Sequence, residues 1–113
     1  MNSILTSIKK MLGISEEDTN FDMDIIPHIN SALMVLRQLG IGPVEGFSIK
    51  DKTAEWDDLV GDNKLYDTVV SYVYLKVKLI FDPPPSTAAI EAIKESISEF
   101  ESRLRDAAEL ENK

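Results

Sequence analysis

The fold of this chain turns on residues 69–86, which read VVSYVYLKVKLIFDPPPS. From Tyr72 to Phe81, apolar residues alternate with tyrosine and lysine, and the β-branched and aromatic content agrees with a strand. However, the apolar positions from Leu65 onward also cover most of the circumference of a helix, and a run of roughly 18 residues without a turn signal is long for a strand. Periodicity alone therefore leaves helix and strand equally open for this segment.

Residues 82–86, DPPPS, end that segment abruptly. Three consecutive prolines fix φ and supply no amide donors, so regular structure cannot continue through them. Ser86 or Thr87 suits the N-cap of a new helix. The apolar seam expected in that helix covers only about two heptads, which favours packing against the domain's own core over a free-standing coiled coil. The seam consists of Ile90, Ile93, Ile97, Phe100 and Leu104.

Two amphipathic helices are predicted in the N-terminal third, over about residues 2–12 and 21–39. Gly13 and Gly40 suit the positions that directly follow the C-termini of these two helices. Pro27 removes one backbone hydrogen bond, so we expect an irregular first turn in the second helix. The residues expected to be buried are Ile4, Leu5, Ile8, Met11 and Leu12 in the first helix, and Ile25, Ile26, Ile29, Leu33, Leu36 and Leu39 in the second.

Residues 41–52 are predicted to form an irregular, mobile loop with few contacts, because glycine and proline break regular structure there. Residues 47–49 could form a short hairpin arm, although an isolated pair of strands is marginal. Residues 56–60 fit one helical turn. Phe47 and Trp56 are large aromatic residues in or beside this region; they either fold back into the small core, which is the favoured interpretation, or anchor a partner protein.

The composition limits the possible functions. A length of 113 residues indicates one domain, and the absence of cysteine excludes disulfides and thiol-based metal or redox sites. The net charge of −8 weighs strongly against a conventional DNA-binding surface, which needs a basic face. The longest apolar run is broken by Lys76 and Lys78 and is too short to span a bilayer.

No pattern in the chain indicates catalysis. Residues 18–24, DTNFDMD, place oxygen ligands at alternate positions, but a calcium loop needs glycine where Met23 stands and glutamate where Ile29 stands. His28 is the only histidine, and neither a serine elbow nor a phosphate-binding glycine loop accompanies it. We therefore expect no enzyme, no catalytic residue, no metal site and no cofactor.

Four short motifs occur in an informative order: QLGIGP at residues 38–43, GFSI at 46–49, WDD at 56–58 and LKVKLIFDPP at 75–84. In this order and spacing, from about Met11 to about Arg105, the chain resembles the head–tail connector family of long-tailed bacteriophages. Members of this family are portal adaptors of the QLG type, associated with DNA packaging. The resemblance implies a mostly α fold, a small bundle of about four or five helices with a long irregular loop or short hairpin between the second and central helices. Residues 69–81 then form the buried central helix. Its expected core residues are Val69, Val73, Val77 and Ile80.

The resemblance also implies a structural role in the virion neck, with assembly in the cytoplasm of a bacterial host. Copies of such a connector form a homo-oligomeric ring beneath the portal protein, extend the DNA channel, and join the head to the next neck or tail-completion protein. DNA would only pass through the channel, without sequence-specific binding, and no membrane partner is implied. The alternative that remains open is a generic helical protein-interaction or regulatory module, monomeric or dimeric.

Connectors of this family commonly grip the portal through their C-terminal region. The resemblance therefore directs attention to the last helix and to a frayed, charged tail expected from about residue 107. Arginine pairs well with carboxylates through two parallel hydrogen bonds, which favours the arginines of this region as contacts. The protein-interface candidates are Phe47, Ile49, Trp56, Arg103 and Arg105.

Overall fold

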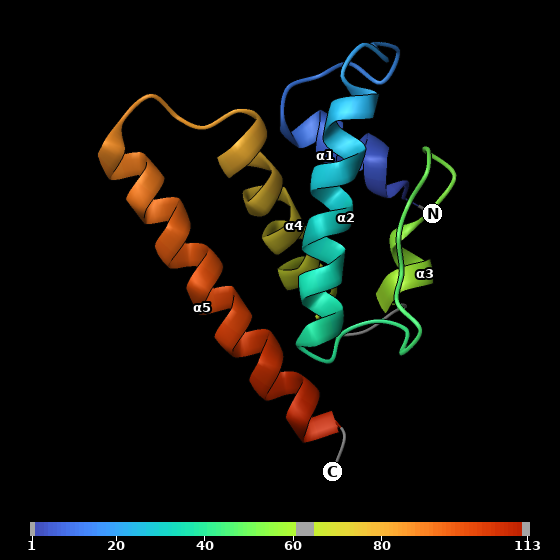
Figure 1. Ribbon diagram of the computed structural model, residues 1–113, viewed down its shortest axis with the longest axis vertical. Helices are drawn as coiled ribbons and strands as arrows, with labels where there is room; N and C mark the ends of the chain where they lie inside the picture. Colours follow the sequence, from blue (N-terminus) through green and yellow to red (C-terminus); the bar gives the residue numbers. More distant parts are fainter. Residues whose placement is uncertain (1, 61–64, 112–113) are drawn as a thin grey trace.

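The computed structural model describes residues 2–60 and 65–111, and five helices account for most of these ranges (Figure 1). Within them there is no strand, only an isolated antiparallel bridge between Ser3 and Glu55, so residues 47–49 lie in a loop. The mostly α fold class is confirmed. The helices are α1 (Ile4–Met11), α2 (Asp22–Gln38), α3 (Trp56–Val60), α4 (Tyr66–Phe81) and α5 (Thr87–Glu111).

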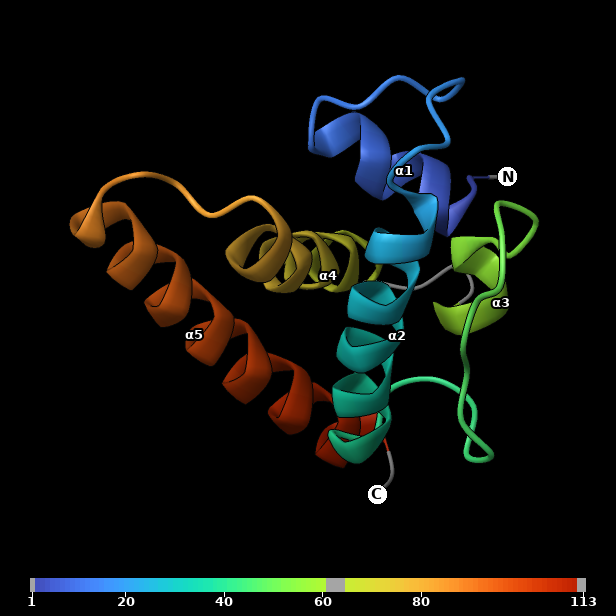
Figure 2. The ribbon, with the colours of Figure 1, turned by 45° about the horizontal axis from the view of Figure 1, so that its top comes forward.

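Helix α4 is the central buried element. Val69, Val73 and Val77 are completely buried, as is Tyr72. Spacings of three and four residues place these side chains on neighbouring positions of a helix, which a strand would have divided between two faces. Helix α2 packs along α4 and α5 packs against another side of it (Figure 2). The helical interpretation of residues 69–81 is therefore confirmed.

Ile80 corrects the predicted core, because 59% of this residue is exposed. It lies at helical spacing from Val73 and Val77, but in the last turn of α4. The following linker carries the start of α5 away from the end of α4 (Figure 1), and it is the neighbouring Phe81 of this turn that packs against another element, with its ring centroid 5.7 Å from that of Phe21. Met11, in the last turn of α1, is 42% exposed as well. Periodicity gives the face of a helix that is buried, but not how far along the axis its neighbours extend.

The corner between α4 and α5 is confirmed. The Asp82 amide donates to the Lys78 carbonyl at 3.0 Å, and the Lys78 ammonium pairs with the Asp82 carboxylate at 3.1 Å, which closes α4. Past the prolines, the Ser86 hydroxyl accepts from the Ala89 amide at 3.1 Å and caps the N-terminus of α5. The chain thus reverses direction within a few residues.

Helix α5 lies across α4 and reaches the end of α2. Ile97 and Leu104 of its predicted seam are buried, and Ala108 extends the buried line by one more turn at 3% exposure. The helix continues to Glu111, so residues 107–111 of the expected tail are helical, and residues 112–113 lie outside the described residues. Ala108 explains this, because it packs beside Gly40, where α2 ends.

Helices α1 and α3 lie on the other side of α4 from α5 (Figure 2). The backbone joins them, because the Ile4 amide donates to the Ala54 carbonyl and the Trp56 amide to the Asn2 carbonyl, both at 3.0 Å. The Ser3 hydroxyl caps α1 by accepting from the Thr6 amide at 3.2 Å. The two helices therefore form one unit that closes the core opposite α5.

Helix α2 is continuous through Pro27, where an irregular turn was expected. Proline removes the amide that would bond the Met23 carbonyl. Met23 is 82% exposed and Pro27 is also exposed, so water can satisfy that carbonyl. Asp22 and Asp24 in the first turn favour the positive end of the helix dipole.

We predict that Gly40→Ala destabilises the protein more than Gly13→Ala. Both glycines have positive φ, at +95° and +83°, so each substitution pays about 1 kcal/mol for the left-handed backbone. A Cβ on Gly40 would stand 3.0 Å from the Ala108 Cβ, whereas no described atom beyond the adjoining backbone lies within 4 Å of one on Gly13. Urea unfolding should show roughly 1 kcal/mol or more of additional loss for Gly40→Ala. Equal losses would mean that α5 is not held at this contact.

Candidate interaction surfaces

The long loop between α2 and α3 is held to α2 by a pair of hydrogen bonds from one side chain. The Ile49 amide donates to Asn30 Oδ1 at 2.7 Å, and Asn30 Nδ2 donates to the Ile49 carbonyl at 3.0 Å. Ile41 and Ile49, which flank residues 42–48 of this loop, are both buried, with 5% and 3% of their surface exposed. The side-chain amide of Asn30 thus satisfies both backbone groups of Ile49, as a neighbouring strand would do.

A second anchor lies near the tip of this loop. Arg37 Nε donates to the Val44 carbonyl at 2.8 Å, and the Gly46 amide donates to the Pro43 carbonyl at 3.0 Å. The expectation that this loop makes few contacts is therefore wrong, because polar side chains of α2 bind its backbone. The mobility of this loop stays a prediction.

We predict that Asn30→Ala loosens this loop. The substitution removes both hydrogen bonds to Ile49 and leaves its partly buried backbone groups unpaired, at a cost of about 1–3 kcal/mol. Amide exchange at Ile49 should accelerate more than exchange in α4. Ser48→Ala, at an exposed neighbouring position, is the control and should change neither quantity. An unchanged Ile49 exchange rate in Asn30→Ala would show that the loop is held by packing alone.

The three interface candidates of the loop region differ in accessibility. Trp56 is 1% exposed and packs edge-to-face with Tyr66, with ring centroids 6.4 Å apart, and Ile49 is also buried. The favoured interpretation of Trp56 as a core residue is confirmed. Phe47 is half-buried and lines a groove of about 440 Å³ together with Met34, which is 57% exposed, and Arg37. Only Phe47 of these three candidates thus has a face available to a partner.

The candidates on α5 lie on its solvent side. Arg103 and Arg105 are both exposed. Arg103 forms an ion pair with Glu99 one turn earlier, whereas Arg105 makes no ion pair within residues 2–60 and 65–111. An exposed i, i+4 pair contributes little to stability, so both guanidinium groups remain available to an incoming carboxylate.

A buried hydroxyl fixes α5 on α4. Tyr72 donates to the Glu101 carboxylate at 2.7 Å, and its ring is completely enclosed. Burial, together with the hydrogen bond to Glu101 and its negative charge, raises the pKa of Tyr72 well above the ordinary value. The folded protein therefore holds this hydroxyl protonated over the whole ordinary pH range.

We predict that Tyr72→Phe lowers stability by about 1 kcal/mol at neutral pH and changes its alkaline dependence. In the unfolded chain Tyr72 ionises near pH 10, whereas the folded state keeps the proton, so the stabilisation is complete below about pH 10 and declines as the pH rises further. The difference in unfolding free energy between wild type and Tyr72→Phe should therefore shrink as the pH rises from about 10 to 11. A constant difference over that range would contradict the raised pKa.

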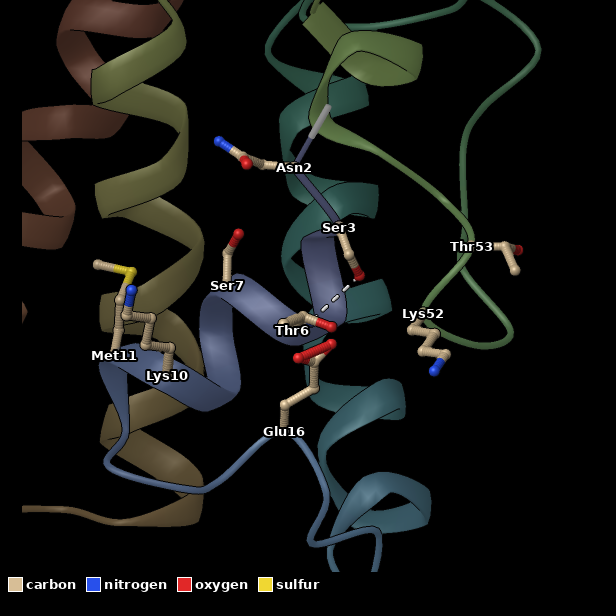
Figure 3. A pocket seen from close by; sticks show the side chains of 9 residues that line it. All are labelled: Asn2, Ser3, Thr6, Ser7, Lys10, Met11, Glu16, Lys52 and Thr53. Carbon is tan, nitrogen blue, oxygen red and sulfur yellow. Dashed lines mark hydrogen bonds between the residues drawn. The ribbon is translucent and has the colours of Figure 1, made fainter.

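A polar groove of about 580 Å³ lies along α1 (Figure 3). Lys52 and Thr53 lie on the loop beside α1, with the Thr53 side chain pointing away from the helix, and the Glu16 side chain points toward Thr6 (Figure 3). We call this feature the α1 groove. Its lining residues are Asn2, Ser3, Thr6, Ser7, Lys10, Met11, Glu16, Lys52 and Thr53.

A buried ion pair, which sequence reasoning missed, lies beside this groove. Lys9 is only 2% exposed, and its ammonium stands 2.9 Å from Asp22 Oδ1, at the start of α2. The same ammonium donates to the Glu16 carbonyl at 3.2 Å. The oxygen of Asp22 is buried and has no hydrogen bond of good geometry, so this contact acts as an ion pair that compensates its charge. The pair ties the end of α1 to the beginning of α2.

The segment considered as a calcium loop and the single histidine show no arrangement for metal binding or catalysis among the described residues. Asp18 Oδ1 accepts from the Asn20 amide at 3.1 Å, a local turn that explains the alternating oxygens of this segment. His28 is half-buried on α2. Among the described residues, no group of three or more acidic, histidine or cysteine side chains lies close enough to hold a metal ion, and no helix is long and apolar enough to cross a bilayer.

Comparison with known proteins gives one match. The sequence model of the phage connector protein family matches residues 4–111, from the start of α1 to the end of α5. No curated protein and no solved structure matches the chain significantly. The match includes the loop, the proline corner and both flanking helices, and it agrees with the resemblance carried by the four sequence motifs. The chain therefore belongs to the phage connector protein family.

Proposed function

We propose that this protein is a head–tail connector that assembles as a ring beneath the portal protein, extends the DNA channel and bridges the head to the next neck or tail-completion protein. The observation that carries the proposal is the family match over residues 4–111. A small rigid helical domain with exposed polar faces suits a protein that joins other proteins by shape and charge. Assembly in the host cytoplasm and incorporation into the virion neck follow from the same proposal.

The acidic composition supports a channel role. A net charge of −8 gives the chain few cations with which to displace counterions from DNA phosphates. DNA that must slide through a ring needs a lining that does not hold it, and an excess of carboxylates favours this. DNA is thus a passing cargo in this proposal, and proteins are the binding partners.

The portal contact is proposed on the solvent side of the C-terminal half of α5. Arg103 and Arg105 are exposed there and can pair with portal carboxylates through parallel hydrogen bonds. Phe47 is a second, separate contact, because its half-buried ring lies beside the exposed Met34. Ile49 and Trp56 contribute indirectly, since their burial holds the loop and α3 in place.

The test is a measurement of solution mass with and without the portal protein of the same phage. We predict that the wild type forms a complex with the portal in which several copies are bound per portal ring. Arg103→Glu combined with Arg105→Glu should remain folded, because both positions are exposed, and should weaken binding at least about tenfold by placing like charges at the contact. Asp24→Lys, at an exposed position on α2, is the control for a change in charge and should bind like wild type.

Two outcomes would count against the proposal. A wild-type chain that neither binds the portal nor self-associates in its presence would favour the generic interaction module. A folded double-arginine variant that fills the portal as well as wild type would keep the connector role but move the docking surface to the Phe47 groove. In that case Phe47→Ala would be the variant that weakens binding.

A further inference from the structure

Arg37 is a cation that the fold holds in place but leaves without a counterion. Its Nε donates to the Val44 carbonyl at 2.8 Å, and a Cβ added to Gly46 would stand only 3.3 Å from its Cδ, so the side chain lies against the loop. Its two terminal amino groups make no hydrogen bond or ion pair within residues 2–60 and 65–111. The guanidinium is therefore exposed and oriented, with two donor groups to offer.

The surface around this guanidinium is hollowed and partly apolar. The Phe47 groove includes Arg37 and Met34 in its lining, and a second hollow of about 370 Å³ includes Arg37 together with Pro43 and Val44. Met34 is 57% exposed and Val44 is 86% exposed. Because the two hollows share Arg37, exposed apolar side chains flank the cation. A partner that covers them removes apolar surface from water.

The charges of the two hollows fit a single carboxylate. Glu45 also lines the Phe47 groove and is exposed, but it forms no ion pair with Arg37 or with any other described residue. The rest of the lining is uncharged, so Arg37 is the one cation of the two hollows among the described residues. A nucleic acid needs several phosphate contacts, which one cation cannot supply. A guanidinium does bind one carboxylate well, through two parallel hydrogen bonds.

We propose that this surface binds a short segment of a partner protein in which an aspartate or glutamate is flanked by apolar side chains. The carboxylate accepts from the two terminal amino groups of Arg37. The apolar side chains cover Met34 and Phe47 on one side of it and Val44 on the other. The surface serves the proposed joining function, on which this inference rests, and it lies on α2 and its loop, separate from the portal contact proposed on α5.

Charge and preorganisation favour such a partner over a second copy of this chain. The Val44 carbonyl already orients the guanidinium, so binding a carboxylate orders little more of the protein. Two copies that each carry a net charge of −8 repel one another, and the single charge of Arg37 offsets little of this repulsion. A different protein needs only one carboxylate at this point and can be neutral or basic elsewhere. The occupant is therefore assigned to another protein.

A peptide titration followed by NMR tests the surface directly. The probe is the peptide acetyl-Leu-Ser-Glu-Ser-Leu-amide, because alternate residues of an extended segment face the same side. The matched control peptide carries glutamine in place of glutamate. The glutamate peptide should shift the signals of the Arg37 Nε–H, the Met34 methyl group and the Phe47 ring. The glutamine peptide should bind at least about tenfold more weakly, because it cannot form charge-assisted hydrogen bonds. Both peptides are compared on the wild-type protein, so no substitution disturbs the fold.

Variants of the groove supply the second measurement. Arg37→Gln should weaken binding of the glutamate peptide about tenfold or more and should abolish the preference over the glutamine peptide. Glu45→Gln removes the one carboxylate that repels the incoming acid and should strengthen binding of the glutamate peptide about twofold or more. Arg105→Gln changes an exposed arginine on α5, outside both hollows, and is the matched control that should bind like wild type.

The outcomes separate this surface from the connector role. Equal binding of the two peptides to wild type, or no binding of either, would overturn the proposed contact and leave the connector role standing. An Arg37→Gln variant that keeps the preference for glutamate, or a Glu45→Gln variant that binds the glutamate peptide less well, would also overturn it. Dimers of the wild type that Arg37→Gln abolishes would assign the surface to a second copy instead. A wild-type chain that binds the glutamate peptide but not the portal would overturn the connector role and keep this surface.

Discussion

The enclosure of α4 on several sides is the constraint on which the rest of the structure depends. Its valines and Tyr72 would be exposed to water if α4 stood alone. Helices α2 and α5 and the α1–α3 unit must therefore cover it. The proline corner then returns the chain across α4, and the Tyr72 hydroxyl fixes where α5 crosses by bonding Glu101. The hydrophobic effect holds the helices together, while this one polar contact sets their register.

Irregular segments are held by backbone contacts that need particular small or polar residues. The end of α2 approaches α5 so closely at Gly40 and Ala108 that one extra methyl group would collide. A single asparagine, Asn30, pairs both backbone groups of Ile49 and replaces a strand partner. A domain of this size has a small core, so such contacts decide whether its loop is a defined surface or a disordered one.

The buried charge of the described residues is compensated locally. Lys9 and Asp22 neutralise each other between α1 and α2, at a position where an isolated charge would be costly.

The sequence by itself determined the helical segments, the caps at Ser86 and the glycines, the proline corner and the buried faces of the helices, because propensity and periodicity act locally. For residues 69–81 the helical and strand periods both fitted, and family resemblance decided between them. Only the tertiary structure decided that Ile80 is exposed, that Lys9 is buried and that Ala108 continues the seam. It also decided that the loop is pinned and that the α1 groove exists. These features depend on which distant segments meet and how far each helix is covered, and no local pattern encodes that.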